Sequence, residues 1–168
     1  MRGLLVIGHG SRRDEANATV RELARRLATE PRPAADGCAG HPLGSGGPTI
    51  AGDPAGPAAP TGPTGPRPWG AVEAAFLEVS RPDIGEGYAN LAVVGCTEIV
   101  VYPFFLFGGN HTRRDLPSAL EEARERHPRT RWILSEPLGL HACVVEAVRA
   151  RLDDTLRELV DTARHPTG

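Results

Sequence analysis

Short apolar runs alternate along the chain with longer stretches in which apolar residues recur every three or four positions. The apolar runs predict buried strands over 3–8, 71–77, 98–107 and 131–134. The amphipathic stretches predict helices over 14–29, 82–94, 117–127 and 142–160. Alternating strands and helices with short links predict an α/β fold. We expect a four-stranded parallel sheet in the order 2-1-3-4, with helices on both faces.

A different composition interrupts this alternation between the first helix and the second strand. About half of residues 31–69 are glycine or proline, and large apolar residues are almost absent. Such a segment buries too little surface to offset the entropy lost on ordering, so we predict a disordered insert. The whole of 1–168 is then expected to form one domain around this insert.

Charge and residue usage exclude several function classes. The chain has 19 basic and 21 acidic residues, so its bulk charge favours neither nucleic acid nor a membrane surface as a partner. No apolar run is long enough to span a membrane, and we predict a cytoplasmic location. All the Lys and Arg positions are arginine. The absence of lysine excludes a phosphate-loop lysine, and with it that ATP-using machinery, and also a Schiff-base lysine.

The three cysteines, Cys38, Cys96 and Cys143, form no C-x-x-C pair, and we predict reduced thiols. Cys38 and His41 have a spacing typical of metal ligands, but they lie in the insert without a second ligand pair. We therefore assign no metal site there.

Three polar side chains follow three predicted strands directly. His9 follows the first strand between Gly8 and Gly10, Glu78 ends the second, and His111 follows the third after two glycines. Parallel strands end at the same edge of a sheet, where ligands bind in this fold class. We expect these three side chains to face one cleft.

Two imidazoles and a carboxylate suit Fe²⁺, Co²⁺ or Ni²⁺, and the same groups accept protons near neutral pH. Each histidine alone could instead be a turn residue bonded to the backbone. Gly8-His9-Gly10 also suggests a dinucleotide loop, but Arg13 stands where the third glycine of that fingerprint is needed.

Polar and basic residues surround the two histidines. Ser11, Arg12 and Arg13 follow His9, whereas Arg113 and Arg114 follow His111. They are either solvated helix starts or a basic collar for a carboxylate-rich ligand, since guanidinium groups pair well with carboxylates. The apolar run over 102–107 could add a wall against a flat ring at its far end.

Several stretches, taken together, resemble one known family. They are LVIGHGSR over 5–12, VEAAFLE over 72–78, VYPFFLFGGNH over 101–111, RDLP over 114–117 and EPLG over 136–139. In these stretches the chain is similar to the sirohydrochlorin chelatases, small class II chelatases that insert cobalt or ferrous iron, and nickel in some archaea. The resemblance implies a chelatase-like half domain. The insert over 31–69 departs from the family pattern.

The resemblance also implies roles and partners. The family's metal-contacting histidines fall on His9 and His111, and its acidic helper falls on Glu78. The implied enzyme binds sirohydrochlorin, inserts Co²⁺ or Fe²⁺ without ATP, and acts in cobalamin or sirohaem biosynthesis. The candidate contacts to the carboxylates of the tetrapyrrole are Ser11, Arg12, Arg113 and Arg114. Larger members carry two similar halves around one cleft, so a single half implies a homodimer.

Two other functions stay open. One is a carrier that binds the metal or the tetrapyrrole without turnover, and the other is a binding module in which both histidines are structural. The same ligands suit all three metals, so both the cobalamin and the sirohaem pathway also stay open.

Overall fold

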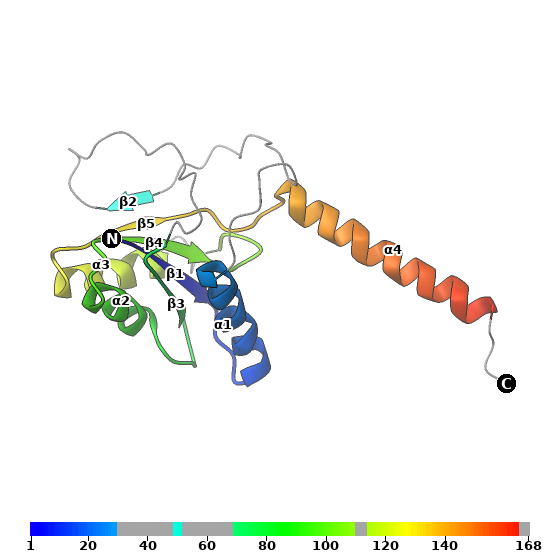
Figure 1. Cartoon of the computed structure of the whole chain (residues 1–168), viewed down its shortest axis with the longest axis horizontal. Helices are drawn as coiled ribbons and strands as arrows, with labels where there is room; N and C mark the ends of the chain where they lie inside the picture. The colour runs from blue at the N-terminus through cyan, green and yellow to red at the C-terminus, as the bar shows by residue number, and fades with distance from the viewer. Residues whose placement is uncertain (30–48, 52–68, 110–113, 165–168) are drawn as a thin grey trace.

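The computed structural model describes residues 1–29, 49–51, 69–109 and 114–164. Its elements are, in chain order, β1 (Arg2–Gly8), α1 (Asp14–Thr29), β2 (Thr49–Ala51), β3 (Ala71–Phe76), α2 (Ile84–Val93), β4 (Glu98–Pro103), α3 (Leu116–Arg126), β5 (Arg131–Leu134) and α4 (Ala142–Arg164) (Figure 1). Each helix and strand predicted from the sequence is present.

The sheet has the order β2-β5-β4-β1-β3. The strands β3, β1, β4 and β5 are parallel, which confirms the predicted four-stranded sheet and its order. The short strand β2 was not predicted, and it pairs antiparallel with β5. These three residues pair there because the open edge of β5 offers unpaired backbone groups. The rest of the insert lies outside the described residues, and the single-domain assignment stays a prediction.

One face of the sheet is covered by α2 and α3. Leu5 and Ile7 of β1 point to this face and pack with Tyr88 of α2 and Leu120 of α3, all of them fully buried. Gly87 brings α2 close to the sheet, since an added Cβ would lie 2.9 Å from the Ala75 Cβ. This glycine, which weakens the helix signal in the sequence, therefore has a packing role.

The other face is covered by α1 over β1 and β3. Val20 and Ala24 of α1 pack against Leu4 and Val6 of β1 and against Phe76. These contacts confirm helices on both faces. The last helix, α4, extends away from the sheet instead of lying on it (Figure 1). It begins as predicted and continues beyond residue 160, to Arg164.

An ion cluster joins three strands at the amino edge of the sheet. The Glu98 carboxylate pairs with Arg2 of β1 and Arg131 of β5. Burial raises the pKa of Glu98, but the two guanidinium groups outweigh burial and hold this pKa below its ordinary value. The cluster therefore ties β1, β4 and β5 together while Glu98 is ionised.

The cysteines follow the prediction in part. Cys96 is a buried free thiol, as expected, and burial raises its pKa. Cys143 is disulfide-bonded, so the expectation of a reduced thiol is wrong at this position. The residue pair Cys38 and His41 lies outside the described residues.

Candidate functional site

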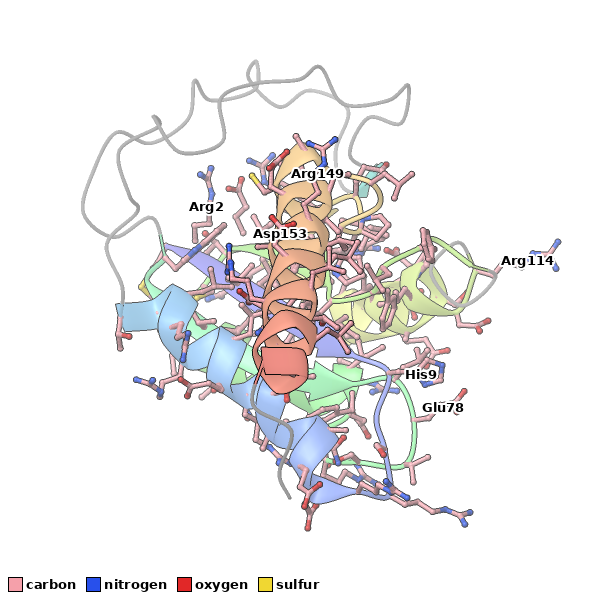
Figure 2. All side chains as sticks on the ribbon, turned by 90° about the vertical axis from the view of Figure 1, so that its right-hand side faces the viewer. Arg2, His9, Glu78, Arg114, Arg149 and Asp153 are labelled. Atoms are coloured by element: carbon pink, nitrogen blue, oxygen red, sulfur yellow. The ribbon has the colours of Figure 1, made fainter. Side chains whose placement is uncertain are left out.

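His9 and Glu78 lie next to each other at the carboxyl edge of the sheet (Figure 2). The pairing of β1 with β3 continues past the strand ends: the Leu77 N–H donates to the Gly8 carbonyl and the Glu78 N–H to the His9 carbonyl, each at 3.0 Å. Both side chains are exposed. The backbone therefore holds an imidazole and a carboxylate that both reach solvent at neighbouring strand ends, and the cleft that they would share with His111 stays a prediction.

Gly10 allows the loops that follow β1 and β3 to touch. Its φ is +93°, and an added Cβ would lie only 1.8 Å from the Glu78 carbonyl oxygen. Only glycine fits this backbone conformation and this approach. Gly8 has a related role, because an added Cβ would lie 2.6 Å from a Val20 methyl group of α1.

Asn17 of α1 supports the loop that follows β1 and contains Ser11. It is 2 % exposed, and its side chain bonds to Ser11 twice: the Ser11 N–H donates to Oδ1 at 2.9 Å, and Nδ2 donates to the Ser11 carbonyl at 2.8 Å. Asn17 was not among the residues predicted for the site. A signal was present, because Asn17 has helical spacing with the buried Val20 and Ala24, and a polar residue on such a face needs partners.

The strand β4 corresponds to the third strand predicted from the sequence. Phe105, which follows it, lies at the same edge. The Phe104 N–H donates to the Ile7 carbonyl at 2.8 Å, and the Phe105 ring meets the His9 imidazole edge to face, with centroids 6.1 Å apart. The strand predicted over 98–107 ends earlier, at Pro103, because the Phe105 N–H turns back to the Pro103 carbonyl.

The other candidates divide into two groups. His111 and Arg113 lie outside the described residues. Arg12 and Arg114 are exposed, and the Arg114 side chain extends outward (Figure 2). The Ser11 hydroxyl oxygen accepts the Arg13 N–H at 3.0 Å. This bond leaves the hydroxyl proton available as a donor.

Two further features are absent from the described residues. No group of three or more His, Cys, Asp or Glu side chains there could hold a metal ion. In that same part of the chain, no helix is both long and apolar enough to cross a bilayer.

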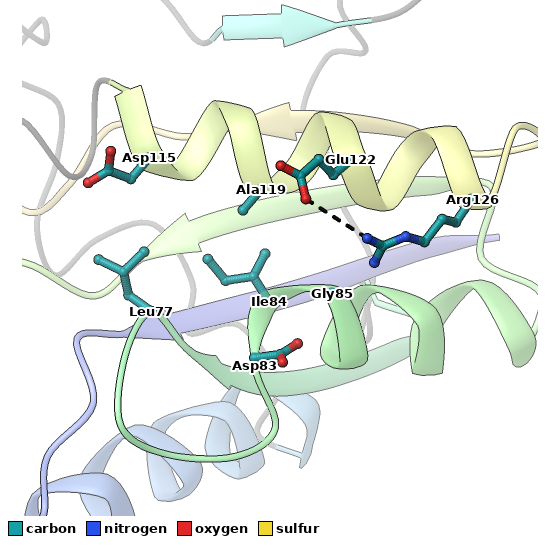
Figure 3. Close-up of a pocket in the computed structure, with 8 residues that line it drawn as sticks. All are labelled: Leu77, Asp83, Ile84, Gly85, Asp115, Ala119, Glu122 and Arg126. Carbon is teal, nitrogen blue, oxygen red and sulfur yellow. Dashed lines mark ion pairs between the residues drawn. The ribbon is translucent and has the colours of Figure 1, made fainter.

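A pocket of about 420 Å³ lies between the start of α2 and the length of α3 (Figure 3). Its lining consists of Leu77, Asp83, Ile84, Gly85, Asp115, Ala119, Glu122 and Arg126. The Asp83 carboxylate is engaged as the cap of α2, where it accepts the Glu86 N–H at 2.9 Å. Glu122 pairs with Arg126 at 3.9 Å. These carboxylates therefore have structural partners of their own.

Fold and site together define a small parallel α/β protein whose carboxyl edge presents a histidine and a glutamate to solvent. The chain belongs to the CbiX family, whose family model matches residues 63–155, more than half of the chain. The matched range includes Glu78 and His111, whereas His9 lies before it. This match confirms the family resemblance seen in the sequence.

Two curated relatives are sirohydrochlorin chelatases. The sirohydrochlorin cobaltochelatase of Priestia megaterium is 30% identical over 61% of this chain and 35% of its own length. The chloroplastic sirohydrochlorin ferrochelatase of Arabidopsis thaliana is 25% identical over 92% of this chain and 52% of its own length. The chain thus spans about half the length of these relatives, or less.

A solved structure of similar size has the same fold. The CbiX protein from Marinobacter aquaeolei VT8 aligns with a TM-score of 0.61 and 19% identity. The alignment covers 94% of this chain and 99% of that one. The two chains therefore share one fold over nearly their whole described lengths.

Proposed function

We propose that this chain inserts Co²⁺ or Fe²⁺ into sirohydrochlorin without ATP, as a chelatase in cobalamin or sirohaem biosynthesis. The observation that carries the proposal is the backbone bond between Glu78 and His9, which holds a carboxylate and an imidazole side by side at the carboxyl edge. The names of the two curated relatives support this choice of substrate and metals. Ni²⁺ suits the same ligands.

In this mechanism His9 and Glu78 hold the hydrated metal ion and displace part of its water. His111, which lies outside the described residues, is proposed as the third ligand. Insertion of M²⁺ releases the two pyrrole protons of the ring, and the imidazole and carboxylate accept them in turn. Protonation lowers the affinity of these groups for the metal, which favours its transfer to the ring.

The ring needs an apolar wall and partners for its carboxylates. Leu106 and Phe107 are 54% and 67% exposed just beyond Phe105, the residue that contacts His9, and they can cover a flat ring. Around them we place the carboxylate contacts on Ser11, Arg12, Arg113 and Arg114, whose groups suit carboxylates.

We also propose that the active protein is a homodimer that builds the cleft between its subunits, as the family resemblance implies. A cytoplasmic location remains the prediction from the sequence.

The test follows the visible spectrum of sirohydrochlorin during anaerobic incubation with Co²⁺ or Fe²⁺, with and without ATP. We expect catalysed metallation that ATP does not change. His9→Ala should lower the rate by at least about 100-fold, and Glu78→Gln by about 10-fold or more. His127→Gln is the matched control, because His127 packs on Tyr88 at the end of α3, near the start of β5.

The alternatives give different results. Tight metal or ring binding without catalysed metallation would identify a carrier. Equal rates in wild type, His9→Ala and Glu78→Gln would show that the two side chains are structural and would overturn the proposal.

A further inference from the structure

The candidate ligand Glu78 lies on the short loop between β3 and α2 (Figure 3). A backbone bond closes this loop at its base, because the Phe76 N–H donates to the Pro82 carbonyl at 2.9 Å. The strand β3 pairs with β1 along its other edge, so the returning chain runs along the outer edge of β3. The loop over 77–82 therefore wraps around the edge of the sheet next to the site.

A strained turn follows Glu78 directly in this loop. Val79 has a φ of +62°, and the Ser80 N–H donates to the Glu78 carbonyl at 2.6 Å, which makes a three-residue turn of an uncommon kind. Such a conformation persists only where the surrounding structure holds it. Contacts from outside the turn therefore fix the loop, and with it the position of the Glu78 carboxylate.

Arg21 of α1 supplies one of these contacts. Its guanidinium carbon lies over the Phe76 ring, 5.1 Å from the centroid, and its Nη2 donates to the Arg81 carbonyl at 3.2 Å. The Phe76 ring is fully buried, so the guanidinium group rests on a fixed surface. Arg21 itself is exposed and lies outside the buried face of α1. Its contacts therefore join the helix to the loop rather than to the core.

Arg81 connects this contact to the other face of the sheet. Its guanidinium group pairs with Asp83 at 2.5 Å and with Glu86 at 2.6 Å, the two residues of the capping box of α2. Because α1 and α2 cover opposite faces, the contacts from Arg21 through Arg81 to α2 span the outer edge of the sheet. They cross that edge three residues after Glu78.

We propose that Arg21 is a positioning residue for Glu78: it clamps the loop over 77–82 to α1 and so holds the carboxylate beside His9. The inference rests on the metal-binding role proposed above for Glu78 and His9. A loop that moves freely presents both groups together for only a fraction of the time, and the apparent affinity for the metal falls by that fraction. The clamp therefore acts on metal binding rather than on ring binding or on the rate at saturating metal.

The first experiment measures metallation by Arg21→Leu while Co²⁺ and sirohydrochlorin are varied in turn. We expect the KM for Co²⁺ to rise about three- to tenfold, with kcat and the KM for sirohydrochlorin within about twofold of the wild type. Arg25→Leu is the matched control, because it removes the same charge one helical turn further along α1, where Arg25 pairs with Glu22. Its KM for Co²⁺ should stay within about twofold of the wild type.

A double-mutant cycle tests whether Arg21 acts through Glu78. In the Glu78→Gln background, the further substitution Arg21→Leu should change the KM for Co²⁺ by no more than about twofold, because the carboxylate that the clamp positions is gone. A merely structural role of Arg21 would make the two effects multiply.

Amide hydrogen exchange tests the clamp without metal, ring or turnover. The N–H groups of Phe76 and Glu78 donate to the carbonyls of Pro82 and His9. In Arg21→Leu these two amides should exchange at least about tenfold faster than in the wild type, while the amides of β4 keep their rates. In Arg25→Leu all these rates should stay at their wild-type values.

Three results would overturn the proposal: an unchanged KM for Co²⁺ in Arg21→Leu, effects of Arg21→Leu and Glu78→Gln that multiply, or wild-type exchange of the loop amides in Arg21→Leu. The proposed chemistry is judged separately. Absence of metallation by the wild type, together with faster exchange in Arg21→Leu, would refute the chelatase activity and leave the clamp of the loop in place. Unchanged exchange in an active enzyme would refute only the clamp.

Discussion

The two edges of the sheet use charged residues in opposite ways. At the amino edge Glu98 is only 9% exposed, and two arginines from neighbouring strands neutralise it. At the carboxyl edge His9 and Glu78 are exposed, and the support beneath them comes from backbone bonds and from the Asn17 amide.

This difference teaches where stability and chemistry are located in the molecule. At the amino edge, Glu98 pairs with two arginines, and these ion pairs link three strands. Backbone support at the carboxyl edge fixes the position of side chains that still reach solvent. Substitutions at the first edge should therefore change stability alone, whereas substitutions at the second should change metallation.

The largest effect is expected for Gly10→Ala at the carboxyl edge. The new Cβ would meet the Glu78 carbonyl, so we expect the free energy of unfolding to fall by about 3 kcal/mol. Metallation should fall by at least about tenfold, because His9 and Glu78 move apart. Urea unfolding and the spectral assay measure both quantities.

A matched control for this substitution is Gly95→Ala. Gly95 has nearly the same φ, +94°, but nothing lies within 4 Å of its added Cβ. Gly95→Ala should lower the free energy of unfolding by only about 1 kcal/mol and leave the metallation rate unchanged. Equal losses at both glycines would contradict the importance of the contact with Glu78.

Glu98→Gln tests the amino edge. We expect a loss of about 2 kcal/mol in the free energy of unfolding at pH 7, with metallation unchanged. Because the pKa of Glu98 is lowered on folding, its stabilisation is present above the unfolded value of about 4.3. This contribution is lost as the pH falls through the folded pKa. Denaturant unfolding at several pH values should show wild type and variant converging in acid, and a constant difference would contradict this account.

Asn17→Ala should have a smaller effect on stability, about 1–2 kcal/mol, because it removes two bonds to the Ser11 backbone. Metallation should fall by about three- to tenfold as the loop that holds His9 loosens. Asn90→Ala, at an exposed asparagine of α2, is the control and should change neither quantity. A normal rate in Asn17→Ala would show that the loop does not need this support.

The smallest effect is expected for Val79→Gly, directly after Glu78. Val79 has a φ of +62° and is 68% exposed, and a β-branched residue is strained in this conformation. Glycine should relieve this strain and raise the free energy of unfolding by about 0.5–1 kcal/mol, after its own entropic cost. Thermal unfolding measures the change, and a lower midpoint would show that position 79 is unstrained.

Local patterns were sufficient for most of the fold. The helix over Asp14–Thr29 and the strand over Arg131–Leu134 have their predicted bounds, because periodicity and flanking residues identify them. The end of β4 could not be predicted in this way, since residues on both sides of Pro103 are apolar. The end is set by a backbone bond that turns Phe105 back to Pro103.

The remaining differences depend on distant partners. Whether Thr49–Ala51 forms a strand depends on the open edge of β5, which is far away in the sequence. The direction of α4 depends on backbone bonds to residues 105 and 106. In the candidate site, the sequence predicts that His9 and Glu78 end neighbouring strands, whereas the contact of Asn17 depends on the position of the Ser11 backbone. Local patterns therefore indicate which polar groups follow the strands, but not which distant residues hold them in place.

The central position of β1 has a consequence for the order of folding. Its two neighbours, β3 and β4, come much later in the chain, and its bond to Glu98 joins residues 96 positions apart. Such distant pairings require closure of a long loop before they gain any contacts, and they slow folding. We therefore expect the backbone bond that joins His9 to Glu78 to form late in folding. During translation the candidate metal ligands come together only when the sheet closes around β1.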